Sequence, residues 1–61
     1  MVKLYAIRTN LFLASGVTER EALKNLVNEI YYTKAGEESY ISIAKYILYM
    51  HEKSRIAVVK E

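Results

Sequence analysis

The sequence contains no cysteine, proline or tryptophan in its 61 residues, and all seven of its acidic side chains are glutamates. Without cysteine, neither disulfide bonds nor thiolate-bound metals can stabilise the fold. The one histidine, His51, has only scattered glutamates as further ligands, so no metal site is expected. Domains this small bury a low fraction of their surface and commonly gain stability from a partner. We therefore expect a homodimer or a complex with a larger protein.

Glycine is also scarce, and its placement excludes a nucleotide-binding loop. The two glycines, Gly16 and Gly36, are too far apart to form a glycine-rich phosphate loop, so no cofactor is expected. His51 is the natural candidate for acid–base chemistry, but its neighbours Ile47 and Leu48 place it at the core edge of a helix end, which favours a structural role. The serines fall at cap, turn or surface positions and form no catalytic triad. We predict that the protein is not an enzyme.

Charge and hydropathy limit the partners further. Nine basic and seven acidic side chains give a net charge of +2, below the dense basic patch of a typical small nucleic-acid binder. No apolar run approaches the roughly 18 residues of a membrane span, and the start of the chain lacks the pattern of a secretion signal. We expect a cytoplasmic protein without membrane contact, folded as a single domain over residues 1–61. Its 52% hydrophobic content and six tyrosines exceed the needs of one small core, which favours a binding surface.

The N-terminal segment contains two runs typical of strands. Residues 2–8 and 11–15 are rich in apolar, β-branched and aromatic side chains, and Thr9 and Asn10 between them are compatible with a two-residue turn. The pattern predicts a β-hairpin. Because neither turn residue is glycine, a single long bent strand is the alternative.

A helix start is the clearest local signal in the sequence. Gly16 breaks the second strand, and Thr18 and Glu21 form a capping box whose hydroxyl and carboxylate accept hydrogen bonds from the first amides of a helix. Such a cap stabilises a helix by about 1 kcal/mol. The pattern predicts a helix over residues 19–33 with one apolar face. The residues on that face are Leu23, Leu26, Val27 and Ile30.

A second helix and a third strand follow. Ala35 and Gly36 favour a left-handed helix end, and residues 37–39 favour the start of a new helix that extends to about residue 53. Residues 55–60 form a β-branched run typical of a strand. On a helical wheel, the broad apolar face of the second helix carries Tyr40, Ile41, Ile43, Ala44, Ile47, Leu48, Met50 and His51.

The predicted order is therefore β-β-α-α-β, a small α+β domain. The most economical architecture is a three-stranded sheet with both helices packed on one face, because this buries one face of the sheet and one stripe of each helix. The other face of the sheet is left partly apolar, which again favours a partner.

The candidate binding residues are aromatic and basic side chains that helical wheels place away from the apolar stripes. They are Tyr32 on the first helix and Lys45, Tyr46, Tyr49 and Lys53 on the second. Tyrosine is enriched in interface hot spots, so a protein-binding or dimer surface is the favoured interpretation. Two alternatives remain open: rings that lie flat against the surface of their own molecule, and rings that stack on nucleic-acid bases between the lysines.

The strand-to-helix segment within residues 13–30 resembles the corresponding joint of HicB-like antitoxins. In those proteins a strand runs through Gly-x-Thr-x-x-Glu-Ala-x-x-Asn into an amphipathic helix, and the matching residues here are Gly16, Thr18, Glu21, Ala22 and Asn25. The resemblance implies a compact sheet-and-helix fold that occludes a partner protein, in that family a small ribonuclease toxin, and no catalytic residue. We accordingly predict a stoichiometric inhibitor or antitoxin-like regulator, of a kind found among small prokaryotic and viral proteins.

The order of strand, helix, Gly36 turn and helix is also similar to that of ribbon-helix-helix repressors, in which paired strands of a dimer read the DNA major groove. This resemblance implies an alternative function, a small dimeric DNA-binding regulator. To read DNA, the paired strands of such a repressor need alternating polar side chains, which residues 11–14 do not supply. The phosphate contacts in this alternative are Lys3, Arg8, Lys45, Lys53 and Arg55.

Overall fold

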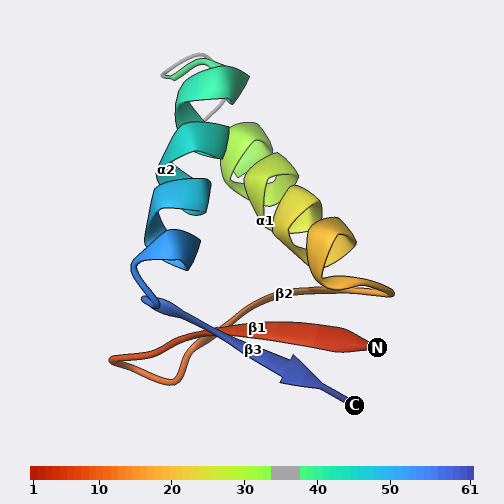
Figure 1. Ribbon diagram of the computed structural model, residues 1–61. Helices are drawn as coiled ribbons and strands as arrows, with labels where there is room; N and C mark the ends of the chain where they lie inside the picture. The colour runs from red at the N-terminus through yellow and green to blue at the C-terminus, as the bar shows by residue number, and fades with distance from the viewer. Residues whose placement is uncertain (34–37) are drawn as a thin grey trace.

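The computed structural model describes residues 1–33 and 38–61 and confirms the predicted α+β fold and element order. Both helices lie on the same side of the sheet (Figure 1), as the sequence predicts. The predicted helix end at Ala35 and Gly36 and the predicted helix start at Glu37 lie outside the described residues. The elements are β1 (Val2–Ala6), β2 (Phe12–Gly16), α1 (Glu19–Thr33), α2 (Tyr40–Glu52) and β3 (Ile56–Lys60).

The three strands form one antiparallel sheet in the order β2-β1-β3. The sheet begins with the predicted hairpin, so the alternative of one bent strand is wrong. Strand β1 is shorter than predicted because the chain turns directly after Ala6. The Asn10 N–H donates to the Ala6 carbonyl at 2.7 Å, and the Ala6 N–H donates to the Leu11 carbonyl at 2.8 Å. Asn10 adopts a φ of 60°, a left-handed conformation that asparagine tolerates better than most residues.

The sheet has one face against the helices and one open face. Leu4, which pairs with Ala14 on β2, is fully buried beneath the helices. On the open face, the rings of Tyr5 and Phe12 meet edge to face with their centroids 5.7 Å apart. Phe12 and Val59 are exposed there, so the predicted partly apolar open face is confirmed.

Close contacts fix the start of α1 on the sheet. A Cβ atom on Gly16 would lie 2.5 Å from the backbone nitrogen of Ala22, so only glycine lets the helix approach this closely. Thr18 Oγ1 accepts a hydrogen bond from the Glu21 N–H at 3.1 Å, as the capping box predicts. The predicted return bond to the Glu21 carboxylate is not formed in the part of the chain that the structure describes. Asn25 Nδ2 donates to the Ser15 carbonyl at 2.9 Å.

The two helices differ in how they contribute to the core. Helix α1 begins and ends where predicted and buries Ala22, Leu26 and Val27. Helix α2 buries only Ile43 and Ile47, a narrower stripe than predicted. The core residues of the described chain are Val2, Leu4, Ala14, Ala22, Leu26, Val27, Ile43, Ile47 and Ile56.

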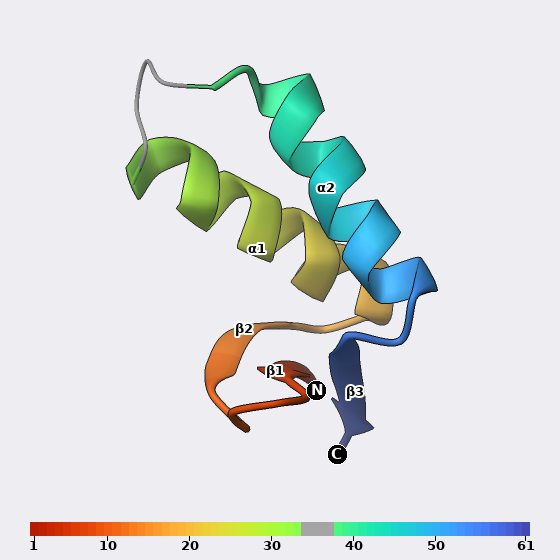
Figure 2. The same cartoon turned by 90° about the vertical axis from the view of Figure 1, so that its left-hand side faces the viewer.

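The predicted broad apolar face of α2 is wrong at three positions, the first of which is Tyr40 at 38% exposed. Ile41 is 66% exposed and Leu48 is 58% exposed. The reason is the path of α2, which packs along α1 and reaches the sheet only near its C-terminal end (Figure 2). One flank of the helix is thereby enough to complete the core, and the remaining apolar side chains face solvent.

Candidate functional site

Helix α2 is apolar on its solvent side as well as on its core side. An amphipathic surface helix normally has a polar outer face, whereas a helix that is apolar all round is normally buried. Here the outer side carries only a few polar groups between large apolar ones. The large apolar side chains that are more than half exposed are Ile41 at 66%, Tyr46 at 58%, Leu48 at 58% and Tyr49 at 55%. Several exposed large apolar side chains on one helix are typical of a binding surface.

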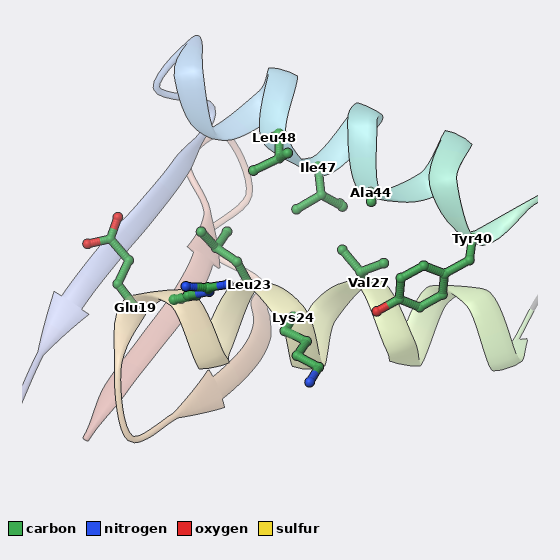
Figure 3. A pocket seen from close by; sticks show the side chains of 9 residues that line it. Glu19, Leu23, Lys24, Val27, Tyr40, Ala44, Ile47 and Leu48 are labelled. Carbon is green, nitrogen blue, oxygen red and sulfur yellow. The ribbon is translucent and has the colours of Figure 1, made fainter.

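A groove of about 660 Å³ runs between the two helices on one flank of this surface. Figure 3 shows Leu23 and Val27 of α1 pointing toward Ala44 and Ile47 of α2, with the ring of Tyr40 at one end. The small side chain of Ala44 leaves the middle of the groove open. The walls are therefore apolar and come from both helices.

The rim of this groove is charged and comes mainly from α1. Arg20 and Lys24 border the groove one helical turn apart. Glu19, next to Arg20, borders the end of the groove that is farther from Tyr40 (Figure 3). Figure 3 shows Lys24 pointing away from the apolar walls. The arrangement of an apolar floor and a mostly basic rim suits an apolar ligand with negative charge beside it.

Tyr46 lies on the opposite flank of α2, where a second hollow of about 390 Å³ opens. Its walls include Ile30 of α1 and Ile43 of α2, and Glu38 and Ser42 lie at its polar end. The sequence predicted an exposed Tyr46 correctly, but it did not predict this hollow, because the hollow depends on the angle between the helices.

Three tyrosine rings gather where α1 ends and α2 begins. The Tyr31 ring meets the Tyr32 ring and the Tyr40 ring edge to face, each with centroids 5.4 Å apart. The Tyr40 hydroxyl donates to Asn28 Oδ1 at 2.7 Å. Sequence reasoning missed this cluster, since it counted Tyr40 as core. The neighbouring pair of tyrosines on α1 was the available signal, but the third ring arrives only through the helix pairing.

The structure divides the predicted binding residues between two helices. Lys45, Tyr46 and Tyr49 lie exposed on α2, and Lys53 lies exposed at its C-cap. Lys53 Nζ lies 5.7 Å from the centroid of the Tyr49 ring, within the range of a cation–π contact. Tyr32 lies on α1, is 74% exposed and packs its ring on Tyr31. Partner binding by these residues stays a prediction.

The predicted phosphate-contacting lysines and arginines are not gathered on one surface. Lys3 lies on the open face of the sheet, where its Nζ atom is 3.4 Å from Glu61 Oε1. Lys45 lies on α2 and Lys53 at its C-cap, and α2 is on the other side of the sheet (Figure 1). The sheet therefore separates Lys3 from Lys45 and Lys53, and nucleic-acid binding by this set stays a prediction.

His51 connects the end of α2 to the start of α1. Its Nε2 atom lies 2.7 Å from Glu19 Oε1, so the imidazole N–H donates to the carboxylate. The two side chains are 33% and 36% exposed, at the edge of the core. This contact suits the structural role predicted for His51, because it holds two helix ends together. Within residues 1–33 and 38–61, no three potential metal ligands lie close enough together to hold an ion.

Comparison of the chain with protein-family models, with curated proteins and with solved structures finds no match.

Proposed function

We propose that this protein is a non-catalytic binding module of the cytoplasm that acts stoichiometrically, by occupying a surface on a larger protein. The observation that carries the proposal is the open apolar groove between α1 and α2, with its walls from both helices and its basic rim on α1. Such a groove is suited to binding, since it offers apolar contact area at a concave site.

The shape of the groove favours a helical segment as its ligand. Two packed helices that leave a groove between them accept the apolar ridge of a third helix, which inserts side chains at i, i+3 and i+4. The gap over Ala44 gives room for one large apolar anchor. Arg20 and Lys24 favour carboxylates beside that anchor. We therefore propose an amphipathic partner helix with acidic residues flanking its apolar stripe.

The resemblance to HicB-like antitoxins supports the same class of function, because those proteins neutralise an enzyme by covering it. The exposed residues Tyr32, Tyr46, Tyr49, Lys45 and Lys53 extend the proposed contact surface beyond the groove. Tyrosine at such positions adds contact area at a low cost in side-chain entropy. An antitoxin-like inhibitor needs only this surface and no reactive group.

The proposal is tested by quantitative capture of the partner with matched charge reversals. The tagged wild-type protein, an Arg20→Glu/Lys24→Glu variant and an Arg8→Glu/Lys60→Glu control are each incubated with host lysate treated with nuclease. All four positions are exposed, and both variants change the net charge equally. We expect one protein captured in a fixed molar ratio by the wild type and the control, and about tenfold less by the groove variant.

Two results would contradict this proposal. Equal capture by the groove variant and the control removes the groove from the interface. Loss of all bound material on nuclease treatment instead favours the alternative of a nucleic-acid-binding regulator. A separate Tyr46→Ala variant measures how far the interface extends around α2, with an expected loss of at least about 1 kcal/mol in binding free energy if the tyrosine takes part.

A further inference from the structure

The outermost strip of α2 has a repeating pattern that the core does not explain. Ile41, Lys45, Leu48 and Glu52 follow one another at spacings of four, three and four residues. This spacing brings side chains to one line along a helix, as at the seam positions of a coiled coil, although here apolar and charged residues alternate along the line. All four are exposed, and Tyr49 lies beside the line. We name these five residues the α2 seam.

We infer that the α2 seam is the interface of a homodimer in which α2 packs antiparallel against α2 of a second copy. The two-fold axis passes between Leu48 and Tyr49, so that each leucine packs against the tyrosine of the other copy. The two helices then overlap over residues 45–52, and Ile41, which is 66% exposed, lies one turn beyond the end of α2 of the second copy. Figure 2 shows the side of α2 that faces away from α1 uncovered by the other helix and strands of residues 1–33 and 38–61.

Charge complementarity selects this arrangement over others. With the axis between Leu48 and Tyr49, Lys45 lies across from Glu52 of the second copy, and the symmetry repeats this pair. A parallel pairing of the same strips would place Lys45 across from Lys45 and Glu52 across from Glu52. Like charges across a seam are destabilising, so the parallel form is disfavoured. The charges of the α2 seam are thus complementary between two copies only in the antiparallel orientation.

The inferred dimer goes beyond the proposed partner binding and does not depend on it. In the dimer, Lys45 and Tyr49 contact the second copy, and the contact with the larger partner is left to the groove and to Tyr32, Tyr46 and Lys53. The two surfaces meet at Leu48, which belongs to the seam and also lines the groove. Tyr49 of the second copy therefore lies at the groove's open edge and adds a wall to it. Homodimerisation also gives the small core the additional burial that a short chain without disulfides needs.

The test is the mass of the full chain in solution, measured by sedimentation equilibrium at several concentrations up to the order of 100 µM, because one helix pair is a small interface. We expect a shift from 7.1 kDa to twice that mass as the concentration rises. Lys45→Glu and Glu52→Lys are each expected to raise the dimer dissociation constant about tenfold or more, since each places like charges in both seam pairs. Lys60→Glu, an equal charge reversal on β3, is the control.

A mixture of the two variants tests whether Lys45 and Glu52 contact each other across the dimer. In a mixture of Lys45→Glu and Glu52→Lys chains, every seam pair again joins a carboxylate to an ammonium group, so a heterodimer of about wild-type affinity is expected. Circular dichroism of each variant checks that the monomer fold is kept. A protein that stays monomeric at every concentration overturns the inference. A dimer that neither variant weakens also overturns it, because such a dimer uses another surface, for example the free edge of β3.

Discussion

Helices α1 and α2 are similar in length but differ in how completely the fold uses their side chains. Helix α1 is fixed to the sheet at its start by the Gly16 contact, the Thr18 cap and the Asn25 hydrogen bond. Its buried residues form one stripe. Helix α2 buries two residues and leaves four large apolar ones more than half exposed. Apart from the exposed Tyr32, the apolar residues of α1 are thus accounted for by folding, whereas α2 contains several apolar residues that folding of one chain does not require.

This difference separates residues that hold the structure from residues that are free to act on other molecules. Exposed apolar side chains lower solubility and give no stability to the monomer, so a patch of them on one helix is evidence for binding. The same logic predicts that substitutions near the start of α1 affect stability strongly, and that substitutions on the outside of α2 affect association.

The largest expected effect is on the α1 side, at Gly16. A Gly16→Val substitution introduces a Cβ atom 2.5 Å from Ala22 N and 2.9 Å from the Glu21 carbonyl carbon. These are backbone atoms, so α1 must move away from the sheet. We expect a loss of about 4 kcal/mol or more, enough to unfold most of a domain this small. Chemical denaturation followed by circular dichroism measures it. Ser15→Ala on the same strand is the control, and equal stability of the two variants would contradict the close packing.

The comparison is sharpened within α2 by two neighbouring residues. Ile47 is 4% exposed and Leu48 is 58% exposed, although they are adjacent in the same helix and their side chains have the same volume. We expect Ile47→Ala to lower the free energy of unfolding by about 3 kcal/mol through a core cavity. Leu48→Ala should lower it by less than about 0.5 kcal/mol when measured at concentrations that keep the chain monomeric. Comparable losses at both positions would show that the outside of α2 also packs within the monomer.

The fold was predictable because its signals are local. The Thr18 cap, the spacing of apolar residues in α1 and the β-branched run of β3 each indicate one element without reference to the others. The turn at Asn10 and the end of β1 at Ala6 were less predictable, because several turn lengths suit the same flanking residues.

The candidate site was only partly predictable. Exposure of Tyr46 and Tyr49 follows from helical periodicity, since neither lies on the core stripe. Exposure of Ile41 and Leu48 does not follow from periodicity. The spacing of apolar residues does not show how much of the apolar face of α2 the neighbouring elements will cover. The groove beside Ala44 requires the crossing of two helices, which depends on the packing of the whole domain.

The smallest expected effect is at the contact that joins the two helices, between Glu19 and His51. Their 2.7 Å hydrogen bond ties the end of α2 to the start of α1, but each side chain is about one third exposed, so solvent weakens the interaction. A double-mutant cycle with Glu19→Gln and His51→Gln should give a coupling energy of about 0.5 kcal/mol. The Lys3 and Glu61 pair, with a longer separation of 3.4 Å, is a control in which a still smaller coupling is expected. A coupling energy between Glu19 and His51 several times larger would contradict this expectation. It would mean that α2 is held to α1 as firmly as α1 is held to the sheet, so that the two helices would differ only in the exposed apolar residues on the outer face of α2.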